Sequence, residues 1–165
     1  MDKETEELEL VAEVFGGLSN RSKLAILLGL EDDKTLKEIA EFLDITQQGL
    51  EKNVGKMMDA GLITWKSDDQ QRYELTPIGE YFVGLIDREW ETLLDAKRTV
   101  QGKEAEARET VESAKQSIDE EEADGFTFQI DEEAWERTVQ TEKWELAEND
   151  LREILDLPAE AAKDE

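Results

Sequence analysis

The sequence predicts a mainly α-helical protein that carries one small β-hairpin. Apolar residues recur at helical spacing through most of the 165-residue chain, and short polar or glycine-containing breaks separate these segments. Helical spacing is lost directly after Gly61, where two runs of β-forming residues flank a polar turn. The length suits one domain, or one small domain followed by an extension.

Two helices are expected at the start of the chain. The first covers residues 6–15 and ends at Gly16 and Gly17; its apolar side carries Leu8, Val11, Ala12 and Phe15. Ser19 or Asn20 can cap the second helix, over residues 21–30. The core candidates of that helix follow i, i+3 and i+4 spacing and are Leu24, Leu27 and Leu28.

Residues 36–63 predict two helices that are joined by a tight turn. Thr35 can cap the first, whose apolar stripe is Leu36, Ile39, Ala40 and Leu43. Thr46 can cap the second, which buries Leu50, Val54, Met57 and Met58 and closes at a left-handed Gly61. Its outer face is polar and carries Gln47, Gln48, Glu51, Lys52, Asn53 and Lys56. Such a pair is the arrangement that enters a DNA major groove, although two ordinary amphipathic helices would show the same spacing.

The region after Gly61 favours the first of these interpretations. Residues 62–65 and 72–75 predict two short strands around a turn at residues 67–70. Two helices, a helix-turn-helix and then a hairpin follow each other in the order of a winged helix domain. The sequence therefore predicts a winged helix-turn-helix over residues 1–90.

Residues 91–165 predict a helical extension. A long helix begins at Pro77, and its pattern beyond residue 98 falls at heptad spacing, although Gly102 weakens the prediction of an unbroken helix. Residues 126–130 alternate as in a short strand, and Asp131 can cap a last helix that reaches about Leu157. We expect these helices to form a homodimer and the tryptophans Trp90, Trp135 and Trp144 to pack in its core or interface. No polar constellation identifies a small-molecule effector.

Composition argues against several classes of function. The chain has no Cys and no His, which excludes disulfides, thiolate or imidazole metal sites and Ser-His-Asp triads. It contains no glycine-rich phosphate loop, so we expect neither an enzyme nor a cofactor. No apolar run approaches the roughly 20 residues that span a bilayer, and the acidic N-terminus does not resemble a signal peptide. A cytoplasmic protein is expected.

The net charge of −25 needs its own explanation, because DNA binding ordinarily depends on cations that neutralise phosphates. The acidic residues could indicate disorder, a DNA mimic or acidic interaction surface, or a protein adapted to molar salt. Regular apolar spacing argues against disorder. The acids are spread along the whole chain, which favours adaptation to molar salt, where the Debye length is about 3 Å.

From about Val11 to Ile86 the chain resembles winged helix-turn-helix transcription regulators of the ArsR/MarR kind. The likeness lies in NRSKLAILLGL, TLKEIAEFLDIT, QQGLEKNVGKMMDAGLI and YELTPIGEYF. With the acidic composition, the closest picture is a haloarchaeal (archaeal, halophilic) regulator. Metal-sensing members use Cys or His, which this chain lacks, so metal sensing is not implied.

The resemblance implies that one face of the Thr46 helix reads double-stranded DNA. The residues on that face are Thr46, Gln47, Gln48, Gly49, Lys52, Asn53 and Lys56. Independently of the resemblance, Gln and Asn can pair with adenine and Lys can reach guanine or phosphate. Lys66 and Arg72 flank the predicted turn as phosphate or minor-groove contacts, and Arg21 and Lys23 lie near a helix N-terminus as phosphate contacts.

The distribution of charge along the chain agrees with DNA contact by this face of the Thr46 helix. Residues 46–66 contain three Lys and two acids, which gives +1, whereas residues 91–165 contain 24 acids and 9 bases, which gives −15. Asp68 and Asp69 in the predicted turn would repel phosphate without an intervening cation. We therefore expect a dimeric DNA-binding regulator, acting as a repressor in high salt. The alternative is a winged helix used for protein interaction, which would depend on residues 126–130 rather than on Gln48 and Lys52.

Overall fold

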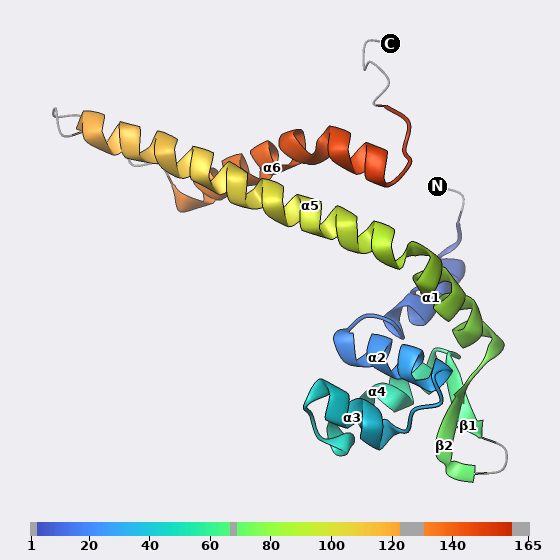
Figure 1. Cartoon of the computed structure of the whole chain (residues 1–165). Coiled ribbons are helices and arrows are strands. Elements are labelled where there is room, and N and C mark those ends of the chain that lie inside the picture. The colour runs from blue at the N-terminus through green and yellow to red at the C-terminus, as the bar shows by residue number, and fades with distance from the viewer. Residues whose placement is uncertain (1–2, 67–68, 123–130, 160–165) are drawn as a thin grey trace. The chain divides into compact units, whose positions relative to one another are not determined.

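The computed structural model describes residues 3–66, 69–122 and 131–159, and these residues form helices and one two-stranded antiparallel hairpin (Figure 1). The helices are α1 (Thr5–Gly16), α2 (Arg21–Glu31), α3 (Leu36–Leu43), α4 (Gln47–Asp59), α5 (Pro77–Glu122) and α6 (Glu132–Ile154). The strands are β1 (Ile63–Lys66) and β2 (Asp69–Leu75). The chain divides into two compact units, Met1–Arg88 and Glu89–Glu165. None of the helices in the described ranges is long and apolar enough to cross a membrane.

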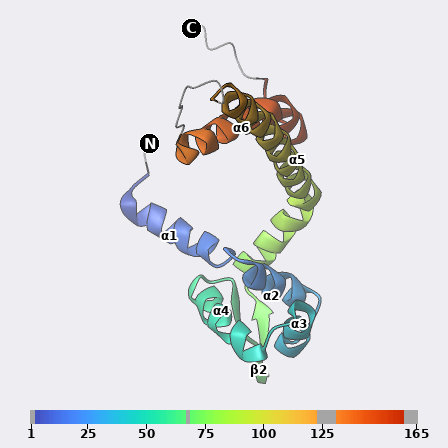
Figure 2. The same cartoon turned by 90° about the vertical axis from the view of Figure 1, so that its left-hand side faces the viewer.

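In the first unit, α2, α3 and α4 pack together beside the hairpin (Figure 2). The core of this unit is formed by apolar side chains from all four elements and from the start of α5. Its buried members are Ile26, Leu27, Leu36, Ile39, Ala40, Leu50, Val54, Met57, Leu62, Ile63, Phe82 and Val83. A continuous core therefore lies under α4 and leaves the opposite face of that helix exposed.

The predicted core face of α2 is confirmed at Leu27, but its centre is shifted towards Ile26. Ile26 and Leu27 are fully buried, whereas Leu24 and Leu28 are only half-buried. The buried stripe begins at Lys23, so a charged residue occupies a position that the sequence pattern assigned to the exterior. Because apolar residues, Ala25 and Ile26 included, occur all around this helix, contacts with other elements decide which face is buried.

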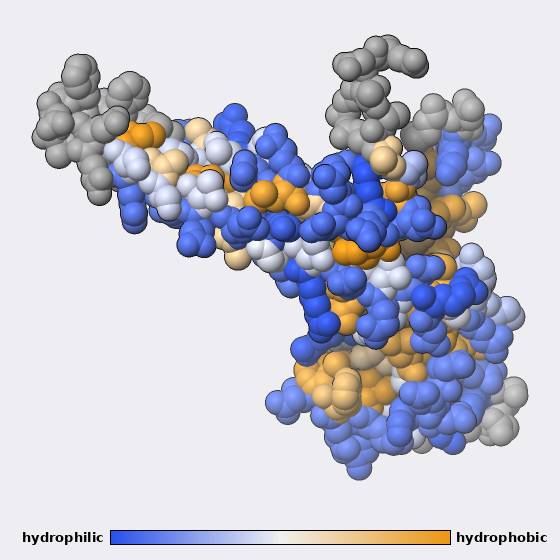
Figure 3. Space-filling model, turned by 45° about the horizontal axis from the view of Figure 1, so that its top comes forward, coloured by the Kyte–Doolittle hydropathy of each residue, from blue (hydrophilic) through white to orange (hydrophobic). Residues whose placement is uncertain are grey.

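The helix α1 contributes no buried residue, although it has an apolar side. Val14 packs partly against the core, and the Phe15 ring contacts the Phe82 ring edge-on at 5.8 Å between centroids. Phe15 nevertheless remains 58% exposed. Figure 3 shows that hydrophilic side chains cover most of the visible surface and that hydrophobic ones gather in separate patches.

The two helices around the tight turn form as predicted. The Thr35 hydroxyl caps α3 by accepting from the Glu38 backbone N–H at 3.2 Å, and the Thr46 hydroxyl caps α4 by accepting from Gly49 at 3.0 Å. Gly61 has the expected positive φ of 83° after α4. These local signals are strong because each cap satisfies a backbone donor that the helix itself leaves unpaired.

The hairpin is also present, but β2 begins at Asp69, three residues earlier than predicted. Ile63 pairs with Leu75 and Trp65 with Tyr73, and the register becomes irregular between Trp65 and Lys66. The Trp65 and Tyr73 rings pack at 4.8 Å between centroids. Residues 67 and 68, and with them the acidic Asp68, lie outside the described residues.

A single threonine joins α4, the hairpin and α5. The Thr76 hydroxyl donates to the Gly61 carbonyl at 2.5 Å and accepts from the Gly79 N–H at 3.1 Å. The Thr76 N–H also donates to the Leu62 carbonyl at 3.0 Å. A Cβ on Gly79 would lie only 2.2 Å from that Leu62 oxygen, so α5 approaches β1 at a distance that only glycine allows.

In the second unit, α5 runs unbroken through Gly102 and packs against α6. Ala107 and Val111 of the predicted heptad are buried against Val139, whereas Ala114 is exposed. The last helix ends at Ile154 rather than near Leu157. The predicted extended segment at residues 126–130 lies outside the described residues.

Ion pairs connect these two helices along their polar sides. Arg108 donates two hydrogen bonds to Glu136, at 2.9 and 2.8 Å, in a bidentate arrangement. Lys115 lies 2.8 Å from Glu132, and Lys103 lies 3.8 Å from Asp150. Opposite charges on α5 and α6 therefore contribute to the alignment of the two helices outside the short apolar contact formed by Ala107, Val111 and Val139.

The close approach at Gly79 gives a first test of the fold. We expect Gly79→Ala to lower the free energy of unfolding by about 2 kcal/mol or more, because the Leu62 backbone must move. Gly84→Ala is the matched control in the same helix. A Cβ there has no neighbour within 4 Å among the described residues, apart from the local helix, and should stabilise by up to about 1 kcal/mol. Urea unfolding followed by circular dichroism measures both, and equal effects would contradict the packing described.

A second prediction concerns the Arg108–Glu136 pair. The hydrogen bonds from Arg108, and a further one from Gln140, lower the pKa of Glu136 from 4.5 to about 2. Since the folded pKa lies below the unfolded one, the pair stabilises the unit fully above pH 4.5 and loses this effect as the pH falls towards 2. Carboxyl NMR titration should show the low midpoint at low salt. Arg108→Gln should return it towards 4.5, and molar KCl should reduce the difference because both side chains are about half exposed. An unshifted midpoint in the unaltered protein would contradict the pairing.

Candidate nucleic-acid interface

The outer face of α4 carries most of the residues that the sequence singled out. Thr46, Gln47, Gln48, Gly49, Lys52 and Lys56 are all exposed. On the opposite face Leu50, Val54 and Met57 are buried in the core, which fixes the rotation of the helix about its axis. The exposed amides and ammonium groups can donate or accept hydrogen bonds toward a partner without any rearrangement of the core.

Asn53 differs from its neighbours because its side chain already has a partner. The Asn20 side-chain N–H donates to the Asn53 carbonyl oxygen at 3.1 Å, and Asn53 is half-buried. Paired reading of adenine requires both the oxygen and the N–H₂ of an amide. In this arrangement one of the two lone pairs of the Asn53 carbonyl oxygen is already engaged, so Asn53 also connects α4 to the residue that caps α2.

Lys23 was expected to contact phosphate, and the structure places it elsewhere. Its side chain is 6% exposed, and the ammonium donates to the Gly16 carbonyl at 2.7 Å and to the Ser19 hydroxyl at 3.3 Å. It therefore closes the turn between α1 and α2 from inside. We exclude Lys23 from the candidate interface, whereas Arg21, two residues earlier, is exposed at the start of α2.

The two cations of the hairpin have different surroundings. The Lys66 ammonium lies 3.8 Å from the Asp33 carboxylate, which connects β1 to the loop before α3. Arg72 of β2 is exposed and has no carboxylate partner among the residues that the structure describes. Arg72 is thus the hairpin cation whose charge is less compensated.

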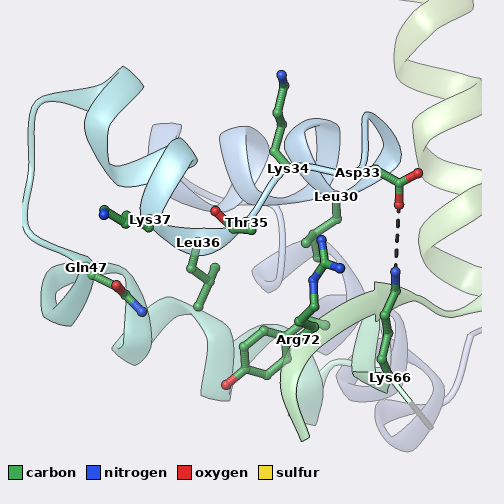
Figure 4. A pocket seen from close by; sticks show the side chains of 10 residues that line it. Leu30, Asp33, Lys34, Thr35, Leu36, Lys37, Gln47, Lys66 and Arg72 are labelled. Carbon is green, nitrogen blue, oxygen red and sulfur yellow. Dashed lines mark ion pairs between the residues drawn. The ribbon is translucent and has the colours of Figure 1, made fainter. Parts of the chain in front are cut away.

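A pocket of about 230 Å³ brings these hairpin cations together with two lysines that the sequence analysis did not single out (Figure 4). It lies between the loop before α3, the first residues of α3 and α4, and the hairpin. Its lining residues are Leu30, Asp33, Lys34, Thr35, Leu36, Lys37, Gln47, Lys66, Arg72 and Tyr73. Lys34 and Lys37 stand about 30 residues before the hairpin, so spacing along the chain gave no sign that they share a site with Arg72.

Tyr73 is the aromatic residue that lines this pocket. Burial raises the pKa of Tyr73, and the nearby Glu51 carboxylate raises it further. The hydroxyl therefore stays protonated at neutral pH and can donate a hydrogen bond.

Comparisons with known protein families, with curated proteins and with solved structures find no match to this chain. The site has to be interpreted from its own geometry.

The different positions of Lys23 and Arg21 lead to a third prediction. Lys23→Met should lower the free energy of unfolding by about 1–3 kcal/mol, because two partly buried hydrogen bonds from a charged donor, to the Gly16 carbonyl and the Ser19 hydroxyl, are lost. Arg21→Gln removes one charge from an exposed position and should change stability by less than about 0.5 kcal/mol. Thermal unfolding of the two variants in the same buffer distinguishes these roles. A Lys23→Met variant as stable as Arg21→Gln would show that the buried ammonium is dispensable.

Proposed function

We propose that this chain is a sequence-specific, DNA-binding transcription regulator built on a winged helix-turn-helix, with α4 as the recognition helix and the β1–β2 hairpin as the wing. The observation that carries the proposal is the two-sided character of α4. Its apolar side is fixed in the core, while its first two turns expose Gln47, Gln48 and Lys52. A rigidly held helix with exposed amides suits the major groove, where base edges offer distinct patterns of donors and acceptors.

The charge distribution supports this face over the strongly acidic residues 91–165. The stretch of residues 46–66 has a formal charge of +1 in a molecule of −25. The proposed solvent is molar KCl, in which screening reduces the repulsion between the acidic surface and phosphate. Cations that bridge carboxylates and phosphates complete the proposed interface.

The proposed active form is a homodimer made through residues 91–165. The dimer is supported by large apolar side chains that remain substantially exposed in the second unit. These are Trp90, Leu93, Trp144 and Leu157. Two recognition helices would then address half-sites about 34 Å apart, and occupation of a promoter would repress it. Sedimentation of a single 18.9 kDa species in molar KCl would contradict the dimer.

The fourth prediction tests DNA recognition directly. Incubation with a pool of genomic fragments in 0.2–3 M KCl should enrich particular sequences, and affinity for them should be flat or should rise with salt. An ordinary basic interface that contacts Z phosphates instead loses affinity with a logarithmic slope of about −0.9Z. Absence of enrichment at every KCl concentration would contradict the proposed function.

Variants connect that result to α4. Gln48→Ala and Lys52→Gln should each weaken binding to an enriched sequence by about 1–3 kcal/mol. Gln48→Ala should relax specificity at one position, whereas Lys97→Gln, an exposed change on α5 outside the proposed interface, is the control and should have no effect. Equal effects of Lys52→Gln and Lys97→Gln would indicate that α4 does not touch DNA.

Protein interaction is a second candidate function, and one observation favours it. Phe42 on α3 is 84% exposed beside the turn that precedes α4. An aromatic ring in that position is typical of a docking contact with another protein. In that case Phe42→Ser would abolish function while Gln48→Ala and Lys52→Ala leave it intact, which is the opposite of the result expected for DNA reading.

A further inference from the structure

The pocket between α3, α4 and the hairpin is unusual in this molecule because cations dominate its lining. Among the side chains that the structure describes, Lys34, Lys37, Lys66 and Arg72 line it, against the one carboxylate of Asp33. The whole chain has 44 acidic and 19 basic residues, so a concave site with the opposite balance is not explained by average composition. A group of cations with low-dielectric walls around it favours binding of an anion.

The ion pairs already present in the pocket are loose. Lys66 lies 3.8 Å from Asp33, and Lys34 lies 3.8 Å from Glu38. Hydrogen-bonded ammonium–carboxylate pairs are usually near 2.7–2.9 Å, so neither contact saturates its lysine. Lys37 and Arg72 have no carboxylate partner within the described parts of the chain. At least two full charges therefore lack local compensation.

The shape of the pocket limits the ligand. Figure 4 shows Gln47 extending from α4 towards Leu36 and the Arg72 guanidinium extending from β2 towards Leu30. The ammonium groups of Lys34 and Lys37 extend away from the space between them. Flexible four-carbon stems allow those lysines to turn toward an anion. A volume of about 230 Å³ is smaller than the roughly 300–1,000 Å³ of sites that hold drug-sized molecules. A phosphate group fits both the volume and the charge, and the Gln47 amide adds a neutral donor.

We propose that this pocket binds a phosphate group through Lys37 and Arg72, with Lys34 and Lys66 as further cations. The phosphate can come from a free phosphorylated small molecule or from the DNA backbone. Because Gln47 belongs both to the pocket and to the outer face of α4, the two sources exclude each other, and a free anion acts as a regulator of DNA binding. This second half of the inference rests on the proposed function, whereas phosphate binding itself does not.

The test uses the full chain and inorganic phosphate as the probe. Phosphate replaces chloride at constant ionic strength while amide NMR signals of residues 34–37, 47 and 72 are followed. We expect saturable shifts with a half-saturating concentration in the millimolar range. Lys37→Gln and Arg72→Gln should each raise that concentration about tenfold, whereas Lys3→Gln, an identical loss of charge at an exposed position outside the pocket, should leave it unchanged. Unchanged signals from the buried core verify that each variant is folded.

The outcomes separate the two proposals. Two outcomes would overturn the phosphate site, regardless of any result on DNA binding. The first is that the shifts rise linearly with phosphate concentration. The second is that they saturate equally in Arg72→Gln, Lys37→Gln and the unaltered chain. Saturable shifts without binding of any duplex would support the pocket and overturn the proposed function. If the chain binds a DNA duplex, phosphate should lower the affinity of the unaltered chain for that duplex severalfold more than chloride does. In Lys37→Gln the two anions should lower the affinity equally. If phosphate and chloride lower the affinity of the unaltered chain for the duplex equally, the proposed competition between free phosphate and DNA is overturned.

Discussion

The hydroxyl of Thr76 is the contact on which the arrangement of the first unit depends. It links the Gly61 carbonyl at the end of α4 to the Gly79 N–H in the first turn of α5. The same residue pairs its backbone with Leu62, so the two ends of the hairpin close on one point. Because Gly79 has no side chain, the first turn of α5 can lie directly against the Leu62 carbonyl, which precedes β1. The hairpin is thereby held beside α4, and the cations on its strands come near the start of α3.

Polar side chains in this unit divide into those that hold the structure and those that face solvent. Lys23 and Asn20 are fully engaged at the turn between α1 and α2, and Asn53 extends that network to α4. Thr35 and Thr46 are caps. What remains on the outer face of α4 is a short set dominated by Gln47, Gln48, Lys52 and Lys56. The engaged residues position the exposed ones, so changes to either group would reduce a function of this face for different physical reasons.

Features that depend on neighbouring residues were predictable from the sequence, and features that depend on packing were not. Thr35, Thr46 and Gly61 act within one helical turn, and their caps and left-handed conformation follow from local chemistry. The α2 core face was predicted correctly only at Leu27, because apolar residues around the helix left its rotation undetermined and because a lysine with internal acceptors can be buried. The candidate pocket was missed since it joins Lys34 and Lys37 to Arg72, which follows them by 38 and 35 positions in the sequence. That α4 recognises DNA stays a prediction.

The composition of the α4 face also fits the solvent in which we propose that it works. In dilute salt, most of the affinity of a protein for DNA comes from counterions released by its lysines and arginines, and this gain disappears as salt approaches molar concentrations. Hydrogen bonds from neutral amides to base edges do not depend on that release. The first turn of α4 offers two glutamines and no charged residue, and its lysines follow only later in the helix. If α4 reads DNA, then its specificity rests on the groups that concentrated salt weakens least. The acidic surface elsewhere can then serve hydration without competing for the same residues.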